Sequence, residues 1–558
     1  MAIREFTNGA ASGDDHDVPH FDDEIASDDR PEVRLVSASP HQAIDEIVEH
    51  LHLDRQLYVR GKALVTIVGA LPPREDDRAP AAESTPMIVP IEHATLTERI
   101  TRTMRIVRRK PLSKTAQAVV DAGGRGPAAE YIPTLPPPGV VSGVLARKQW
   151  PLRHLAAVSE TPILRPDGSV MQDPGYDRAT GYVYRPGCAF APVPLSPSQA
   201  DAAKALAELN EVFADFPYVD DAARMVPIAA ILTLLARSAI HGAVPAFLLD
   251  ATTRGSGKTL QADAVSAVAL GRSAARKSYP VEEEELGKIL AAYATAGARL
   301  VLFDNVTREF GGGELDQCLT ARDTVELRPL GRTEILKLPW AAVIMASGNN
   351  IVLGEDTVRR VLVARLETPL ENPEDRTNFK HPQLFEWILE ERPRLVVAAM
   401  TILRAFARLG GHQHDGKAWG SFEAWSRLVP GAIMFAGGAD PMLARPSIEQ
   451  HASDASRALV AVLEYLPRLD VLGGGMTVRE MVTALYPEKT SAADRRADGL
   501  DPLRDALEAW APPKLGQPPS LQTLGLRFRS HIGRHVGGRK IARVGDPAGK
   551  GAARWIVT

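Results

Sequence analysis

A strand, a turn of small residues and a helix follow one another directly in residues 246–270, AFLLDATTRGSGKTLQADAVSAVAL. AFLLD is a short apolar run, and KTLQADAVSAVAL has apolar residues at helical spacing. A strand, a glycine-rich loop and a helix in this order are the context that a phosphate-binding loop of the form G-x-x-x-x-G-K-[ST] needs. The run therefore predicts a nucleotide site inside an α/β layer.

Each residue of this loop has an expected task. Gly255 and Gly257 allow backbone N–H groups to close around phosphate oxygens, and the helix N-terminus adds partial positive charge. Lys258 is expected to reach the β- and γ-phosphates, and Thr259 to hold Mg²⁺ through its hydroxyl. Thr252 stands where the usual pattern has glycine, and a small residue fits there. The predicted nucleotide-binding residues are Thr253, Arg254, Gly255, Ser256, Gly257, Lys258 and Thr259.

A second apolar strand, in RLVLFDNV, ends in Asp304. We expect this carboxylate to bind Mg²⁺ beside Thr259, as the second acidic motif of such a site does. Asn305 follows, where many such ATPases carry a glutamate that orients the attacking water. Two alternatives stay open: slow hydrolysis, or another water-orienting residue, for which Glu309 and Glu314 are nearby.

A third apolar strand, in WAAVIMASGNN, ends in Asn349. Its amide is expected to bind the attacking water or the γ-phosphate. TVRRVLVARLE follows, and its adjacent Arg359 and Arg360 point differently in a helical or extended chain. One of them is a candidate arginine finger for a neighbouring subunit. The alternative is a basic pair on the surface.

The motifs GSGKT, RLVLFDNV, ASGNN and DTVRRVLVARLE together resemble AAA+ ATPases of the superfamily-three helicase type. The set is most similar to replicative helicases and primase-associated ATPases of phages, plasmids and integrated elements. The resemblance covers most of residues 50–558 and is strongest over 240–440. It implies an AAA+ P-loop NTPase core with a parallel sheet and a helical flank. It also implies a homo-hexameric ring around DNA, ATP bound between subunits, and a primase among the partners to consider.

DTVELRPLGRTEILKLPW, between Asp304 and Asn349, predicts a β-hairpin around Pro329–Gly331. In the resembled helicases a hairpin at this place holds the DNA backbone in the ring channel. Arg328 and Arg332 match that placement and would contact phosphates without reading sequence. The alternative is an ordinary turn with solvated arginines.

The last 88 residues, 471–558, contain a strongly basic segment. LQTLGLRFRSHIGR predicts a helix, and RKIARVG and ARWIVT predict two strands, which with the helix VREMVTALYP indicate a winged-helix-like unit. A basic helix beside a basic hairpin is the electrostatic footprint of duplex DNA binding. A protein-interaction domain is the alternative. The predicted DNA-binding residues here are Arg527, Arg529, Arg534, Arg539 and Lys540.

Changes in composition and the positions of linker segments divide the chain into further parts. Two isolated cysteines, Cys188 and Cys318, favour neither a disulfide framework nor a zinc site and suit a reducing cytosol. No run of 18 apolar residues and no signal peptide is visible, so we expect a cytoplasmic protein without a membrane span. The predicted parts are a disordered acidic tail (1–35), an α+β accessory domain (36–190), a linker (191–200), the ATPase core (201–380), a helical region (381–470) and the basic unit (471–558).

These features predict an ATP-dependent DNA helicase or translocase that acts as a ring in replication of a phage, plasmid or integrated element. Its DNA would be single-stranded or forked in the ring and duplex at the C-terminal unit. The rival prediction is a regulatory or defence protein that binds DNA and uses ATP as a switch without unwinding. A degenerate structural subunit of a replication complex is a third. The accessory domain shows no metal-binding carboxylate pair, and oligomerisation, origin binding and primase contact stay open for it.

Overall fold

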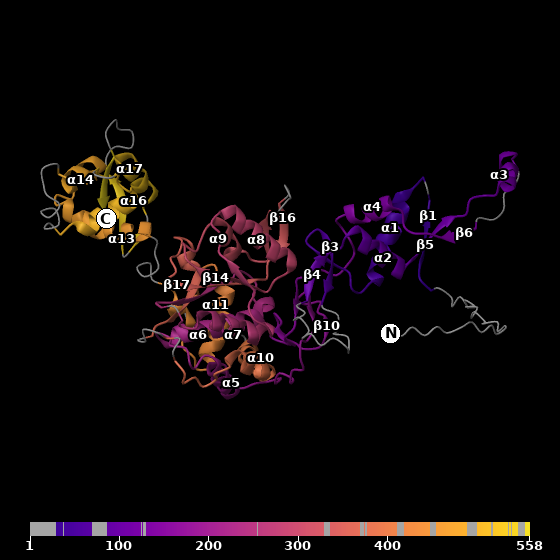
Figure 1. Ribbon diagram of the computed structural model, residues 1–558, viewed down its shortest axis with the longest axis horizontal. Coiled ribbons are helices and arrows are strands. Elements are labelled where there is room, and N and C mark those ends of the chain that lie inside the picture. Colours follow the sequence, from indigo (N-terminus) through magenta and orange to yellow (C-terminus); the bar gives the residue numbers. More distant parts are fainter. Residues whose placement is uncertain are drawn as a thin grey trace, which may run out of the picture. The chain divides into compact units, whose positions relative to one another are not determined.

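The computed structural model describes residues 29–36, 38–69, 86–123, 125, 130–253, 255–328, 335–368, 373, 376–409, 418–446, 454–487, 499–514, 517–533, 535–536, 538–544 and 553–558. Most of the predicted acidic tail, together with Arg254, Arg332 and Arg534, lies outside these residues. The chain forms two compact units (Figure 1). The first comprises residues 1–55 and 92–151, and the second comprises 56–91 and 152–558.

The first unit contains a three-stranded sheet and several helices. The sheet order is β1 (Glu32–Leu35), β5 (Arg105–Arg109), β6 (Tyr131–Pro133), and β1 runs parallel to β5. The helices are α1 (Pro40–His50), α2 (His93–Thr103), α3 (Lys114–Asp121) and α4 (Pro138–Ala146), with the 3-10 turn Leu51–Leu53. The helix expected over LTERITRTMRIVRR ends at Thr103. Its second half is strand β5, because sheet pairing buries both Ile106 and Val107.

Short strands from residues 58–90 and 157–184 belong to the second unit. One sheet consists of β2 (Tyr58–Arg60), β3 (Ala63–Val68) and β4 (Met87–Pro90). A second sheet consists of β7 (Ala157–Ser159), β10 (Gly175–Tyr176) and β11 (Tyr182–Tyr184). The strands β8 (Ile163–Leu164) and β9 (Val170–Met171) form a separate pair. Gly61 has a φ of +57° in the β2–β3 turn and Gly168 a φ of +79° in the β8–β9 turn. The patterns YVRGKALV and ILRPDGSVM, each with two apolar runs around a glycine turn, predict these two hairpins, and the structure confirms both.

The centre of the second unit is a five-stranded sheet in which every pair is parallel. The order is β13 (Arg276–Ser278), β14 (Leu300–Val306), β17 (Val343–Asn349), β12 (Ala246–Ala251), β18 (Val361–Leu366). The predicted parallel sheet is thus confirmed, and β17 lies between the strands that carry the loop and Asp304. β12 is buried throughout, with Phe247 and Leu249 in one apolar core and Ala246 and Leu248 in the other.

Helices cover both faces of this sheet. They are α5 (Gln199–Val212), α6 (Asp221–Ala236), α7 (Lys258–Leu270), α8 (Glu283–Ala296), α9 (Gly313–Thr320), α10 (Leu384–Arg408) and α11 (Glu423–Phe435), with 3-10 turns at Arg237–Ala239, Thr357–Arg360 and Pro441–Ala444. Helices α5, α6, α7, α10 and α11 share one core, and α8 and α9 share the other (Figure 1). Residues 221–239 are long and apolar enough to span a membrane, but 83% of their most apolar window is buried within the protein.

The hairpin predicted between Asp304 and Asn349 is present as β15 (Thr324–Leu327) paired antiparallel with β16 (Leu336–Pro339). Val325, Leu327 and Leu338 point into the core that also contains α8 and α9. This apolar face fixes the base of the hairpin on that core. The turn over residues 329–334 lies outside the described residues.

The C-terminal region has its own apolar core. Its elements are α13 (Asp454–Leu469), β19 (Met476–Thr477), α14 (Val478–Leu485), α16 (Asp501–Trp510), α17 (Leu521–Ser530), β20 (His535–Val536), β21 (Arg539–Val544) and β22 (Arg554–Val557). The strand order is β19-β22-β21-β20. Trp510 and Trp555 both pack on Phe528, with ring centroids 5.3 and 5.4 Å from it. The predicted helices α14 and α17 and the predicted strand pair β21–β22 are confirmed.

A buried arginine ties the β2–β4 sheet to helix α8 and strand β16. The Arg60 guanidinium donates to the carbonyl oxygens of Ala294 at 2.7 Å, Pro339 at 3.1 Å and Leu155 at 3.1 Å, and also to Ala156. Burial lowers the pKa of Arg60 to about 10. The division of the fold therefore differs from the predicted accessory domain over 36–190, because strands from that range are bonded to α8 and β16.

We expect Arg60→Ala to lower the free energy of unfolding of the second unit by about 2–4 kcal/mol, because it leaves several buried carbonyl groups without donors. The measurement is urea unfolding of the full chain, followed by tryptophan fluorescence. Arg185→Ala is the matched control, since Arg185 is exposed. Equal unfolding midpoints for the two variants would contradict the role assigned to Arg60.

Candidate nucleotide-binding site

The loop between β12 and α7 has the backbone shape that the sequence predicts. Gly255 and Gly257 have φ values of +74° and +90°, the left-handed region that glycine adopts without strain. Gly257 is the N-terminal cap of α7. The Lys258 ammonium donates to the Thr253 carbonyl oxygen at 3.1 Å and to the Ser256 hydroxyl at 3.2 Å. The lysine thus lies folded over its own loop, with Thr259 half-buried beside it on the first turn of α7.

Two carboxylates, from the strands β12 and β14 on either side of β17, act electrostatically on this lysine. Burial lowers the pKa of Lys258, and the charges of Asp250 and Asp304 oppose that effect. Asp304 accepts hydrogen bonds from the Ser347 hydroxyl and from the Asn305 backbone N–H at 3.1 Å, and Arg276 Nε lies 3.8 Å from it. Ser347 belongs to the adjacent strand β17, so the sheet itself orients the Asp304 carboxylate.

The donor set fits Mg²⁺ bound together with a nucleotide. Mg²⁺ in such sites takes one or two carboxylates, and phosphate oxygens and water complete its shell. Asp304 supplies the carboxylate and Thr259 the hydroxyl, and these are the residues that would hold the ion. Bound there, Mg²⁺ would offset the phosphate charge.

Asn349 closes the third side of the site. It lies at the end of β17, directly opposite Ala251, the last residue before the loop. Its side-chain oxygen is buried and has no hydrogen-bond partner among the residues that the structure describes. Because buried polar atoms are nearly always paired in folded proteins, this orphaned amide oxygen next to the loop is available to accept a hydrogen bond from a ligand or a water.

A buried ion pair that the sequence analysis missed holds these strand ends together. Asp250, on β12, is fully buried and pairs with Arg365 on β18. It also accepts the backbone N–H of Ile351 at 3.2 Å. Arg365 donates in turn to the side chain of Asn350 at 2.8 Å, and Asn350 has a φ of +49°. The sequence feature that could have indicated this ion pair is the aspartate at the end of the otherwise apolar run AFLLD.

The candidate water-orienting residues lie in different places. Asn305 is exposed with a φ of +53°, and its backbone N–H bridges Asp304 and Ser347. Glu314 lies against α8, where its carboxyl carbon would be 3.1 Å from a Cβ added at Gly287. Burial raises the pKa of both Glu309 and Glu314, with Glu355 and Glu283 adding to the two effects.

The two adjacent arginines, Arg359 and Arg360, lie in different environments. Arg360 forms an ion pair with Asp316 on α9 at 2.7 Å, and that carboxylate also accepts the Thr357 hydroxyl. Arg359 is exposed and has no side-chain partner in the described part of the chain. Only Arg359 therefore presents a guanidinium that another molecule can take without breaking an internal ion pair.

The predicted DNA-contacting residues are partly described. Arg328 is exposed at the end of β15. On α17, Leu524 and Phe528 point inward, and Arg527 and Arg529 are exposed on the two sides of Phe528. On β21, Arg539 is exposed and Lys540 half-buried. Arg332 and Arg534 lie outside the described residues.

A pocket of about 660 Å³ adjoins the loop. Gly255, Gly257 and Leu260 form one wall, and Phe216 and Phe379 contribute aromatic rings. Burial of a nucleotide base between such apolar side chains is the usual design of cofactor pockets. The sequence analysis missed these residues because they come from two segments that no motif connects to the loop.

We expect Gly257→Ala to weaken nucleotide binding by about ten-fold or more, because a 1.4 kcal/mol loss already has that effect. A Cβ at Gly257 would lie 3.1 Å from the Phe216 ring in a backbone conformation with a φ of +90°. The measurement is a titration with a fluorescent ATP analogue. Gly437→Ala is the matched control, since its φ is +88° and its Cβ would meet nothing within 4 Å. Equal affinities of the two variants would show that the loop does not bind the nucleotide.

No protein-family model matches this chain, and no curated protein matches it. Among solved structures, it is similar to the apo A form of the NrS-1 C terminal region, with 11% identity, 77% of this chain and 91% of that chain covered, and a TM-score of 0.33. It is also similar to the X-ray structure of JCV helicase, with 13% identity, 38% and 62% covered, and a TM-score of 0.19. Likenesses this weak carry no argument, and the function proposed below rests on the site.

Proposed function

We propose that this chain binds and hydrolyses ATP with Mg²⁺ between β12, β14 and β17. One observation carries the proposal. The glycine loop with Lys258, the Asp304 carboxylate oriented by Ser347, and the unpartnered Asn349 amide come from three strands that are neighbours in one parallel sheet. Ligands in open α/β sheets bind at the carboxyl ends of such strands. In this assignment Lys258 contacts the phosphates, and Asn349 binds the γ-phosphate or the attacking water.

We further propose that ATP turnover drives a DNA helicase or translocase of the AAA+ type, assembled as a ring of identical subunits. Three features support this. The β15–β16 hairpin presents Arg328, the winged-helix-like C-terminal region exposes Arg527 and Arg529 on α17, and Arg359 is exposed for a neighbouring subunit. The resemblance of the motifs supplies the context, replication of a phage, plasmid or integrated element.

A second function is favoured by one specific observation. The exposed side chain that follows Asp304 is the amide of Asn305, which cannot act as a general base as a carboxylate does. A regulatory or defence protein that binds DNA and uses ATP as a switch needs to bind ATP, but it needs to hydrolyse little of it. The two functions therefore differ in whether ATP is consumed continuously.

We expect the ATPase rate of the full chain to rise when single-stranded or forked DNA is added, and Lys258→Ala to abolish the activity with and without DNA. A loss of 10²-fold or more is about 2.7 kcal/mol of transition-state stabilisation. Lys204→Ala is the matched control, because Lys204 is an exposed residue on α5. Tight ATP binding without turnover under every DNA condition would instead support the switch, and normal hydrolysis by Lys258→Ala would contradict the site.

We expect Arg359→Ala to lose ATP turnover while keeping its affinity for ATP, because the guanidinium would act on the site of the next subunit. Mixing inactive Arg359→Ala with inactive Lys258→Ala should restore activity, since some interfaces then combine an intact loop with an intact arginine. The measurement is the ATPase rate over a series of mixing ratios. Arg360→Ala is the comparison variant, and we expect lower stability from it because it breaks the ion pair with Asp316. A mixture as inactive as its components would contradict the shared site.

A further inference from the structure

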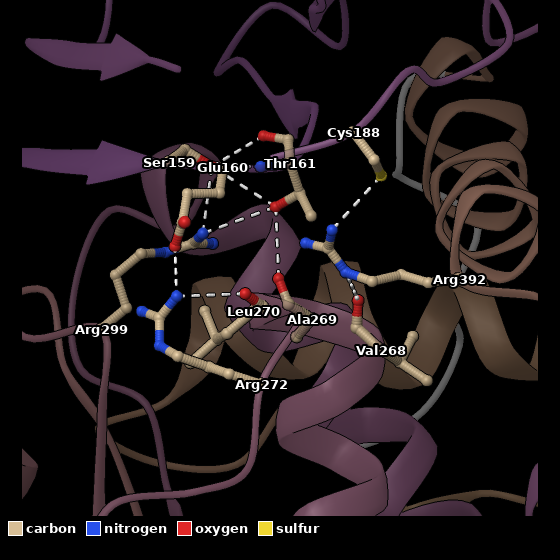
Figure 2. A network of polar contacts seen from close by, with 10 residues as sticks. All are labelled: Ser159, Glu160, Thr161, Cys188, Val268, Ala269, Leu270, Arg272, Arg299 and Arg392. Atoms are coloured by element: carbon tan, nitrogen blue, oxygen red, sulfur yellow. Dashed lines mark hydrogen bonds and ion pairs between the residues drawn. The ribbon is translucent and has the colours of Figure 1, made fainter. Parts of the chain in front are cut away.

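The arginines at the C-terminal end of α7 are bonded within the fold itself (Figure 2). Arg272 forms an ion pair with Glu160, and Arg299 donates to the Ser159 hydroxyl at 3.0 Å. Arg392, on α10, donates to a carbonyl oxygen in the last turn of α7 at 3.4 Å. Cations at this end of a helix also interact favourably with its dipole. These side chains therefore join segments of the second unit.

The basic residues at the end of β5, in the first unit, lack such partners. The stretch RRKPLSK, residues 108–114, has four cations and no carboxylate. Arg108, Arg109 and Lys114 are exposed and have no side-chain partner in the part of the chain that the structure describes. Of the four, Lys110 alone forms an ion pair there, with Glu130 at 2.9 Å. Three cations can therefore bind another molecule without breaking an internal contact.

The strands that carry these cations extend beyond the core of the first unit. β5 is buried at Ile106 and Val107 and exposed at its last two residues. β1 ends opposite Arg108, so only β5 and β6 are paired from Arg109 onward. The helix that follows β5, α3, has no buried residue, and Figure 1 shows it beyond β6, away from α1 and α2. The end of β5 and β6 thus form a projecting two-stranded ribbon.

Both faces of this ribbon carry positive charge. Successive side chains of a strand point to opposite faces, so Arg108 and Arg109 lie on different sides. Tyr131 is the register partner of Arg109, shares its face and is 37% exposed. The Arg34 guanidinium, which is paired with Glu32, lies 4.7 Å from the centroid of that tyrosine ring. One face is therefore basic and aromatic, and the other presents Arg108.

We propose that this ribbon with the start of α3, residues 108–114 and 130–133, is an arm that binds duplex DNA through phosphate contacts of Arg108, Arg109 and Lys114. The major groove of B-DNA admits a two-stranded ribbon. A ribbon with a cation on each face offers one to the phosphate backbone on either side of the groove. Such contacts position DNA without reading its sequence. The inference rests on the proposed function for its partner, DNA, and is independent of the nucleotide site.

The test is a fluorescence-anisotropy titration of a labelled duplex with the full chain over a series of salt concentrations. Each phosphate contact contributes about −0.9 to the slope of log affinity against log salt. We expect Arg108→Gln combined with Arg109→Gln to weaken duplex binding by about ten-fold or more and to make the slope less steep by about two. Lys114→Gln, outside the sheet, should make it less steep by about one.

Arg102→Gln is the matched control. Arg102 is an exposed arginine of the same unit, and it pairs with Glu98 on α2, so this variant should keep the wild-type affinity and slope. All the substituted side chains are exposed, and circular dichroism should show that every variant is folded. A titration with a fluorescent ATP analogue should give the same affinity for all of them, because the arm does not contact the nucleotide.

Wild-type duplex affinity and slope in the Arg108→Gln, Arg109→Gln chain would overturn the arm and leave the proposed function standing. A change of assembly mass in light scattering with unchanged duplex binding would also overturn it, because the ribbon would then contact protein. If the wild-type chain binds no duplex, the arm is refuted, and stimulation of the ATPase rate by single-stranded DNA decides the proposed function separately.

Discussion

The position of β17 between β14 and β12 is the constraint on which the site depends. With all five strands parallel, every carboxyl end lies at one edge of the sheet, and this order puts three polar strand ends side by side. Asp304, Asn349 and the loop after Ala251 are far apart in sequence but adjacent in the sheet. The burial of β12 on both faces fixes that edge, because each of its apolar residues is held by one of two apolar cores.

The sequence analysis predicted the elements whose signals are local. An apolar run ending in a glycine turn and a helix specifies its own conformation, and the β12–α7 loop has the predicted form. The hairpins at Gly61 and Gly168 and the helix α17 follow from equally local patterns. The error in β5 has the same origin: TMRIVRR has good helix formers, and only the pairing of Arg105–Arg109 with β1 makes it a strand. Tertiary pairing overrode local propensity there.

The features that could not be predicted all join distant segments. Arg60 reaches carbonyl groups more than 230 residues away, and Asp250 pairs with Arg365 across two strands. From sequence alone, an arginine in a strand or an aspartate at the end of an apolar run is expected to be solvated. Its buried partners become known only from the structure. The wall of Phe216 and Phe379 is missed for the same reason. Sequence motifs identify the candidate site residues, whereas the contacts that hold these residues in place become visible only in the structure.

The chain passes between the two compact units three times, near residues 55, 91 and 151. The first unit is therefore discontinuous, and strands β2–β4 of the second unit are inserted within it. No single cut separates the two: a fragment beginning at residue 152 would lack Arg60 and expose the carbonyl groups that it satisfies. During synthesis, the first unit cannot be complete until residue 151 has been made, so the inserted strands emerge before the α8 and β16 partners that they need. Arg60 on nascent β2 therefore emerges 234 residues before Ala294 and 279 residues before Pro339, two of the carbonyl partners to which it donates.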